Sequence, residues 1–358
     1  MKRFILSLSV ALCLTSISLA QTAVSSYIPG VTAEGAIYFL PKTGIRITVC
    51  VEKTTYTPGN LCKYAERYLR IKNVSQNAAI DHRIISIKQE AFAVADTSKR
   101  YAVKFDAKTT ASNVRLSGDG VLMAINTDYK PSALKPLPTF QAPKPALNPH
   151  QYLSEETLAA GSTSKMAELI ALDIYEIRES RNLLTRGQAD FMPQDGEQLR
   201  LMLNKLEEQD LALTSLYTGT TICDTTAFSF TVIPDEDIKQ QILFRFSQKL
   251  GIVAEDDLSG SPYYINIEDL KSVPLAADPI DPKKKHKQVN GIYINVPGKL
   301  RSTISNLQGR LLSNEFPAGQ FGNVELLSGA LFNKRYTTRL LLNPISGAVE
   351  SLDAEQPK

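Results

Sequence analysis

One stretch decides the fold: Ile45-Arg46-Ile47-Thr48-Val49-Cys50-Val51-Glu52-Lys53. Its aliphatic residues occupy every second position, while polar residues and Cys50 occupy the positions between them. Successive side chains of a β-strand point to opposite faces, so this alternation predicts a strand with one buried face and one polar face.

The sequence around this strand extends a β-rich region over residues 21–130. Short alternating runs follow at 83–88, 91–95, 101–105 and 121–125, separated by polar segments. One small amphipathic helix is expected where apolar residues recur at helical spacing, at Tyr64, Ala65, Tyr68 and Leu69. We therefore predict an N-terminal β-rich domain with one short helix.

Residues 131–150 change character, because six prolines fall within this stretch. Proline lacks the amide donor and fixes φ, so the stretch can form neither a helix nor a central strand. We expect an extended linker; a proline-rich ligand for a partner domain is the alternative.

Helical periodicity follows over residues 151–219. An apolar stripe that includes Ile170 and Ile174 leads to Arg186-Gly187, a cation and a glycine that end a helix. A second stripe starts at Asp195 and Gln198, which have capping-box spacing, and ends at Gly219. Two helices of equal length joined by a short loop predict a long antiparallel hairpin.

Alternation returns over residues 220–358, with strand-like runs at 228–232, 242–246, 263–267, 292–296, 324–327 and 337–342. These runs predict a C-terminal β-rich domain. The predicted fold class is α+β, with two antiparallel β-rich domains separated by a long antiparallel helical hairpin.

The composition is that of an ordinary globular protein. The 358 residues are 43% hydrophobic and 22% charged, which excludes disordered, collagen-like and polytopic membrane classes. The formal charge is +3, and loss of Lys2 and Arg3 with a signal peptide lowers it to +1. So small a charge gives no reason to expect nucleic acid as a partner.

Residues 1–20 have the pattern of a secretory signal peptide. Lys2 and Arg3 precede an apolar run, and the small residues Ser18 and Ala20 predict cleavage after Ala20. Cys13 as a lipoprotein anchor is the alternative, but Leu12 stands where a small residue is expected. No later segment reaches the ~20 apolar residues of a transmembrane segment. We therefore expect a soluble exported protein, periplasmic or associated with the cell surface.

Three cysteines remain after cleavage: Cys50, Cys62 and Cys223. An odd number in an exported protein leaves one thiol over or forms an intermolecular bond. A disulfide between Cys50 and Cys62 would close a loop of about 13 residues. Cys223 as the partner of Cys50, and three unpaired thiols, are the alternatives.

Leu40-Pro41-Lys42-Thr43-Gly44 matches the LPxTG signal for attachment to a bacterial wall. The motif lies near the mature N-terminus, without the hydrophobic segment and basic tail that must follow a sorting signal at the C-terminus. We interpret it as the beginning of a strand.

Several short motifs occur together in this chain. They are Tyr38 with Leu40-Pro41-Lys42-Thr43, Tyr64-Ala65 with Tyr68-Leu69, Gly291-Ile292-Tyr293, Val296-Pro297-Gly298, Pro317, Gln320-Phe321-Gly322, and Asn343-Pro344 with Gly347. Together they resemble an exported Bacteroidetes family, domain of unknown function 4831. The resemblance implies a location in the envelope of a Gram-negative bacterium, and it identifies no catalytic or binding residue.

The motifs of common enzyme classes do not occur. The three histidines lie far apart, and no HExxH, GxSxG or Walker motif occurs, so we predict no catalytic, cofactor-binding or metal-binding residue. Thr225, in Asp224-Thr225-Thr226, resembles a Bacteroidetes O-glycosylation site. A basic loop that could contact an anion contains Lys283, Lys284, Lys285 and Lys287.

The sequence therefore favours a non-enzymatic envelope protein that engages another envelope protein or has a structural role. A periplasmic hydrolase acting on a glycan or peptide is one alternative, and it requires carboxylates that face each other in a cleft. A lipid- or polysaccharide-binding module is the other, and it requires an apolar cavity or a tyrosine-lined groove, since the chain has no Trp.

Overall fold

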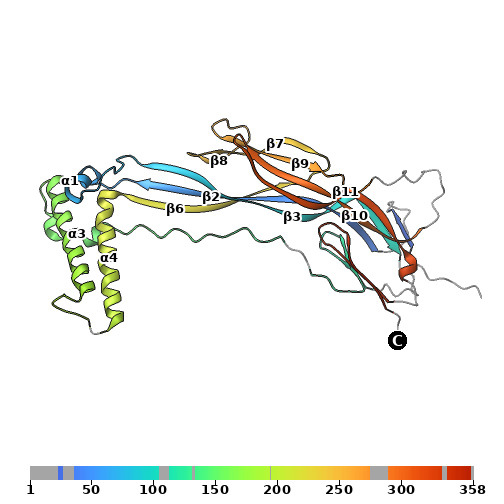
Figure 1. Cartoon of the computed structure of the whole chain (residues 1–358), viewed down its shortest axis with the longest axis horizontal. Helices are drawn as coiled ribbons and strands as arrows, with labels where there is room; N and C mark the ends of the chain where they lie inside the picture. The colour runs from blue at the N-terminus through green and yellow to red at the C-terminus, as the bar shows by residue number, and fades with distance from the viewer. Residues whose placement is uncertain are drawn as a thin grey trace, which may run out of the picture.

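The protein is an elongated body with a sheet along its length and helices at one end (Figure 1). This computed structural model describes residues 23–26, 36–104, 113–130, 134–193, 195–274, 289–332 and 337–355. Two predicted features lie outside the described residues: the cleavage site after Ala20 and the basic loop with Lys283, Lys284, Lys285 and Lys287.

Strand β2 (Ala36–Thr57) runs along the long axis of the body (Figure 1). Ile45, Ile47 and Val49 are fully buried, as their spacing predicts. β2 pairs antiparallel with β3 (Ala79–Lys104) on one edge and with β6 (Thr220–Val232) on the other. With backbone partners on both edges over residues 45–56, β2 is a central strand there.

The described strands form two sheets. The larger has nine strands, in the order β6-β2-β3-β1-β10-β9-β7-β8 with β11 paired to β10. Its remaining members are β1 (Ala23–Ser26), β7 (Ile238–Ser247), β8 (Gly251–Val253), β9 (Ser261–Asp269), β10 (Val289–Asn306) and β11 (Gly309–Ser328). The smaller sheet, in the order β13-β12-β5-β4, contains β4 (Val114–Leu116), β5 (Leu122–Ile125), β12 (Thr337–Leu342) and β13 (Val349–Glu355).

These strands do not follow the predicted division into two β-rich domains. β6 comes from the C-terminal region, yet all its residues pair with β2. β1 likewise joins β3 to β10. Alternation predicts that a segment is a strand but does not identify its partner, so the long-range pairing could not be read locally. The α+β class itself holds, because sheet dominates and helices are fewer.

Two hydrophobic cores reflect the same mixing of N- and C-terminal segments. The first packs β2 against the strands that follow β6, through Ile45, Ile47, Val49, Phe244, Ile265 and Leu300. The second joins the start of β2 to the smaller sheet and to η3 (Gly329–Phe332), through Tyr38, Leu40, Leu122, Ile292, Phe332 and Leu340.

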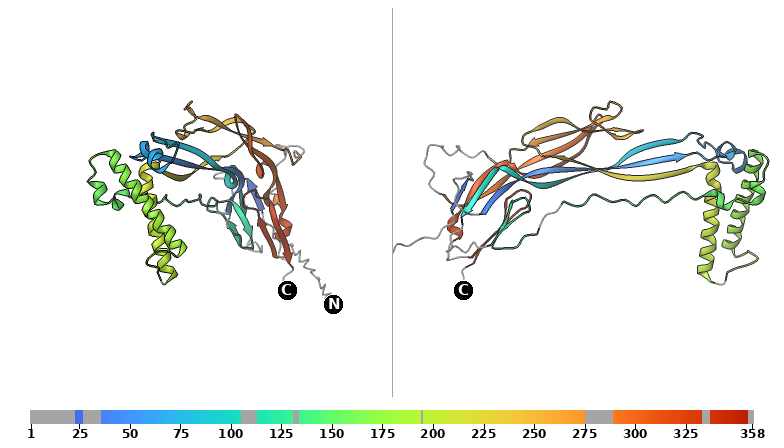
Figure 2. Two further views of the ribbon diagram at one scale, coloured as in Figure 1. Left: turned by 60° about the vertical axis from the view of Figure 1, so that its left-hand side comes forward. Right: turned by 180° about the vertical axis from the view of Figure 1, so that it is seen from behind.

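Helices form a head at one end of the body (Figure 2). They are η1 (Cys62–Tyr64), α1 (Ala65–Leu69), η2 (Pro149–Tyr152), α2 (Glu155–Leu158), α3 (Thr163–Arg186) and α4 (Gly196–Thr218). α3 and α4 lie side by side and leave the sheet at a steep angle (Figures 1 and 2). Ile170 of α3 and Leu213 of α4 pack with Ala65 of α1 in a third core.

Local sequence explains where the two long helices begin and end. The side chains of Ser162 and Asp195 accept hydrogen bonds from first-turn amides of α3 and α4. Gly187 ends α3 at φ 69°, and Gly219 ends α4 at φ 77°, in the region that favours glycine. A Cβ at Gly219 would also lie 2.4 Å from the carbonyl oxygen of Thr57. The end of α4 and the end of β2 can therefore meet only at a glycine.

Residues 134–148 form an extended strap, exposed along its whole length, that runs between the smaller sheet and the head (Figure 1). At one end the Arg46 guanidinium donates to the Lys135 carbonyl at 2.5 Å. At the other end Ala146 and Leu147 lie beside α4 and the start of β6. The strap is most of the described part of the stretch predicted as a linker, and the last two residues of that stretch, 149 and 150, begin η2 instead.

β3 is one strand where the sequence predicts three. Residues 96–99 lie opposite Leu40 alone, between the pairs Ala95–Pro41 and Arg100–Phe39. There the Asp96 carboxylate accepts bonds from the backbone and the hydroxyl of Ser98. The polar segment that resembles a turn between strands is thus a bulge within one strand.

We expect Ile47→Ala to lower the free energy of unfolding by about 2–5 kcal/mol, because it empties a core site. Ile85→Ala is the matched control, since Ile85 is 43% exposed and Ile47 is 0% exposed. The control should cost less than about 1 kcal/mol. Urea unfolding followed by circular dichroism measures both, and equal losses would contradict the burial of Ile47.

Candidate functional site

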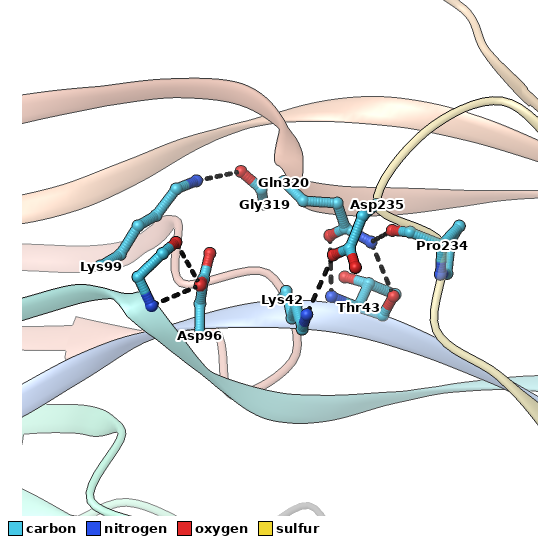
Figure 3. A network of polar contacts seen from close by, with 9 residues as sticks. Lys42, Thr43, Asp96, Lys99, Pro234, Asp235, Gly319 and Gln320 are labelled. Atoms are coloured by element: carbon cyan, nitrogen blue, oxygen red, sulfur yellow. Dashed lines mark hydrogen bonds and ion pairs between the residues drawn. The ribbon is translucent and has the colours of Figure 1, made fainter.

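A cluster of polar contacts surrounds Thr43, between the start of β2, which packs on the smaller sheet, and the part of β2 that pairs with β6 (Figure 3). Thr43 and Lys42 belong to the motif Leu40–Gly44. Three further segments converge on them: β3 with Asp96 and Lys99, the loop after β6 with Pro234 and Asp235, and β11 with Gly319 and Gln320.

The Gln320 side chain takes the place of a neighbouring strand for Thr43. The Thr43 amide donates to Gln320 Oε1 at 2.8 Å, and Gln320 Nε2 donates to the Thr43 carbonyl at 2.8 Å. Nε2 also donates to the Pro234 carbonyl at 3.0 Å. Both backbone groups of Thr43 are satisfied in this way at a point where no β6 residue pairs with it.

Two more side chains tie β2 to the C-terminal segments. The Thr43 hydroxyl donates to the Pro317 carbonyl at 2.8 Å. Asn295 Nδ2 donates to the carbonyls of Pro41 and Ser346 at 2.8 and 3.0 Å. Packing is close here, because a Cβ at Gly347 would lie 2.7 Å from the Pro41 ring.

Charged groups lie at the border of this cluster. Lys42 Nζ lies 2.9 Å from an Asp235 carboxylate oxygen, and the Asp235 side chain is 74% exposed. Such an exposed pair contributes little to stability. Lys99 Nζ donates to the Gly319 carbonyl at 3.1 Å. Burial lowers the pKa of Lys99, and the nearby Asp96 carboxylate partly opposes this effect.

Three tyrosines continue the cluster toward the smaller sheet. The Tyr38 hydroxyl accepts from the Tyr293 amide at 2.9 Å and donates to the Tyr293 carbonyl at 3.2 Å. The rings of Tyr101 and Tyr293 stack with centroids 4.5 Å apart. Burial raises the pKa of Tyr38 far above its usual value and also raises the pKa of Tyr101.

The geometry of the Thr43 cluster is structural, because its donors bond to the protein's own backbone. Leu40 and Thr43 are both 0% exposed, so the LPxTG-like motif is inaccessible to a sorting enzyme. Asn295 Oδ1 is buried and has no partner among the described residues. The cluster joins β2, β11 and the turn at 343–347.

Most of the motifs singled out in the sequence meet in and around this cluster, whereas Tyr64-Ala65 with Tyr68-Leu69 lies in the head. Tyr38 bonds to Tyr293, and Pro41 bonds to Asn295, which lies between two of the motifs. Sequence reasoning assigned no role to Gln320 or Asn295. The only signal was that Gln320 belongs to a motif and Asn295 lies between two motifs, since their partners are distant in sequence.

The predicted Cys50–Cys62 disulfide is not formed, because Cys50, Cys62 and Cys223 are free thiols. Cys50 lies in mid-strand, and the seven residues to the end of β2 at Thr57 span about 23 Å. Cys62 lies beyond that end, in η1, out of reach of a bond that needs Cα atoms within about 7 Å. Cys50 is also buried, not on an open polar face.

Thr225, the predicted glycosylation site, lies in β6 opposite Glu52 and is half-buried. Nothing in the structure tests its modification, which stays a prediction.

Two open hollows lie along α4. The first, of about 200 Å³, is lined by residues of the strap, by Leu211 and Ser215 of α4, and by Thr220–Ile222 of β6. The second, of about 380 Å³, lies on the outer face of α4 between Leu201 and Leu211. Its carboxylates, Glu207 and Glu208, come from one helical turn and not from facing segments.

Asp173 of α3 has a carboxyl group with a raised pKa. Burial raises the pKa of Asp173, and the charge of Glu176 adds to the effect, while the Ser154 hydroxyl lies 3.5 Å from the carboxylate. In the described ranges no three His, Cys, Asp or Glu residues are arranged to hold a metal ion. No helix in the described part of the chain is both long and apolar enough to cross a membrane.

Comparison with known proteins gives one match. The model of a family described as a domain of unknown function, DUF4831, matches residues 34–350, which include the whole Thr43 cluster. No curated protein and no solved structure matches the chain.

Gln320→Glu should destabilise the protein by about 2–4 kcal/mol at neutral pH, because a carboxylate cannot donate to the carbonyls of Thr43 and Pro234. These carbonyls raise the pKa of the introduced carboxyl above its unfolded value. The loss is therefore full above the folded pKa and disappears as the pH falls below about 4. Urea unfolding at several pH values measures it. Gln308→Glu, at an exposed turn, is the control, and a pH-independent loss would contradict the assignment.

Alkaline pH should weaken the fold through Tyr217, which is buried and donates to the Ala167 carbonyl. Burial raises its pKa well above the ordinary value near 10. The unfolded chain then loses its proton first, so stability falls as the pH rises through about 10. Tyr217→Phe should reduce this pH dependence, measured as the urea midpoint between about pH 8 and 11. Tyr175→Phe, at a residue 46% exposed that is only the smallest cause of the raised pKa of Tyr217, should change it much less.

Proposed function

The chain belongs to the DUF4831 family, and we propose that it is an exported, non-enzymatic envelope protein that engages another protein or has a structural role. The observation that carries this proposal is the Thr43 cluster. Its side chains join the chain's own segments, whereas the exposed strap and the helical head extend away from it. The exposed strap and the head provide surfaces that another protein could bind, whereas the Thr43 cluster binds the protein's own segments.

Export is proposed from residues 1–20. Lys2 and Arg3 followed by an apolar run and small residues before Gln21 are typical of a secretory signal peptide. The resemblance to exported Bacteroidetes proteins supports an envelope location.

The described surface does not favour the two alternative functions. A hydrolase needs facing carboxylates, and those in the hollow beside α4 belong to neighbouring positions of one helix. The three clustered tyrosines do not form a carbohydrate-binding groove, because Tyr38 is 1% exposed and Tyr101 and Tyr293 are stacked against each other.

The test is cross-linking and affinity purification of the tagged full chain from the envelope of its native host. We expect a mature chain that begins at Gln21 and a partner protein recovered in stoichiometric amount. Mass spectrometry identifies both. The matched control is the chain without residues 1–20, which should stay in the cytoplasm and recover no such partner.

Either half of the proposal can fail separately. A native protein that retains Met1 would contradict export. A correctly processed chain that recovers no stoichiometric partner with cross-linkers of several lengths would contradict the role in engaging another protein.

A further inference from the structure

The outer edge of β6 is a long strand edge without the usual protection. β6 has 13 residues, and among the described residues its ladder partner is β2 alone. The ladder with β2 contains no register shift, and Asp224 is the only charged residue of the strand. Every second residue of such a strand directs its amide and carbonyl away from the sheet, ready to pair with another chain.

Other free edges in the described sheets carry the devices that normally prevent such pairing. β4 and β8 are only three residues long. β11 contains Pro317, and its ladder with β10 has two register shifts. β3 and β13 carry several charges, among them Asp81, Arg83, Lys88, Glu350 and Asp353. β6 differs from them in length, regularity and neutrality.

The surroundings of β6 decide what can pair with this edge. The strap and the α3–α4 pair both lie on the β6 side of the sheet (Figures 1 and 2). A second folded copy would have to place its own sheet where α4 and the strap already lie. The strap itself forms no ladder with β6, and its prolines lack amide donors. The edge is therefore suited to a single extended chain.

We propose that the outer edge of β6 binds an extended segment of a partner protein by β-strand addition, with a cation of that segment opposite Asp224. The hollow lined by Thr220–Ile222, Leu211 and Leu147 receives one end of the segment. This inference rests on the proposed function and names the surface and the partner chemistry for it.

The side chains of β6 define the sequence of the partner strand. Phe228, Phe230 and Val232 are half-buried and pack against the first core, so apolar partner residues opposite them would extend that core. The opposite face is small and polar, with Thr221, Cys223, Ser229 and Thr231 exposed. A partner strand that alternates apolar and small polar residues fits both faces.

Residues 220–232, with T220V and D224V in the peptide so that apolar side chains stand opposite Val232 and Phe228 of the chain, supply a defined probe. A synthetic peptide of residues 220–232 that pairs antiparallel in full overlap places its position 228 opposite Asp224 and its position 229 opposite Cys223. The probe carries C223S together with either F228K or F228D. It lacks the folded sheet that would collide with α4.

The first experiment measures binding of the fluorescent peptides to the mature chain by anisotropy. The F228K peptide should bind about fivefold more tightly than the F228D peptide, since opposite charges attract across a strand pair and like charges repel. The preference should reverse in the D224K chain and vanish in the D224N chain. Circular dichroism confirms that each variant is folded.

The second experiment uses the exposed thiol of Cys223 to read the register. The peptide carries S229C activated as a mixed disulfide with thionitrobenzoate. The Cys223 thiolate attacks the peptide sulfur, an S–S bond forms between chain and peptide, and thionitrobenzoate leaves. The same peptide with T221C instead of S229C should react at least tenfold more slowly, and C223S in the chain should abolish the product.

Equal affinities of the F228K and F228D peptides, equal rates of the two activated peptides, or no saturable binding would overturn the proposal. Dimerisation of the wild-type chain in sedimentation, together with a monomeric D224K chain, would also overturn the proposal, because a second copy of the chain would then occupy the edge. These assays use only the purified chain, so their failure leaves the recovery of an envelope partner as an independent test of the proposed function.

Discussion

The fold depends on the need of β2 for backbone partners on both edges. Its aliphatic face is fully buried, so its amides and carbonyls must bond within the sheet. β3 follows β2 in sequence and supplies one edge, but β6 begins only at Thr220 and supplies the other. The strap and the helices η2, α2, α3 and α4 of the head lie between β3 and β6 in sequence. The chain leaves the sheet after β3 and must return to pair with β2 along its free edge. It returns where Gly219 contacts Thr57.

Features with local causes could be predicted from the sequence. Alternation at 45–53 identified the buried face of β2, and glycines at 187 and 219 mark the ends of α3 and α4. The partner of β2 could not be predicted, because nothing local in β6 distinguishes pairing with β2 from pairing with a C-terminal neighbour. The segment at Asp96 was predicted as a turn because its polar sequence suits a turn. The bond from the Ser98 amide to the Asp96 carboxylate occurs in turns and also in this bulge, so the local sequence does not distinguish them.

Cys50 illustrates a different limit. The alternation of apolar and polar residues placed Cys50 correctly on the polar face of β2. That face is nevertheless buried at Cys50, because Ser86 of β3 and Ala227 of β6 flank the thiol. The Thr43 cluster escaped prediction as well. The Gln320 amide bonds to backbone groups 277 residues away in sequence. A single glutamine forms no sequence pattern from which such a bond could be predicted. Short motifs marked the participants, and only the fold reveals that they touch.

The strap has a consequence for how this family can vary in length. From Arg46 to Thr57 the β2 ladder covers about 36 Å at the usual rise of a strand. The strap runs over the same interval from Lys135 to Leu147, and twelve residues of polyproline II span about 37 Å. The segment is therefore already taut. An insertion that lengthens the ladder by a pair of residues must be accompanied by one in the proline-rich stretch, so the two regions should gain and lose residues together among relatives.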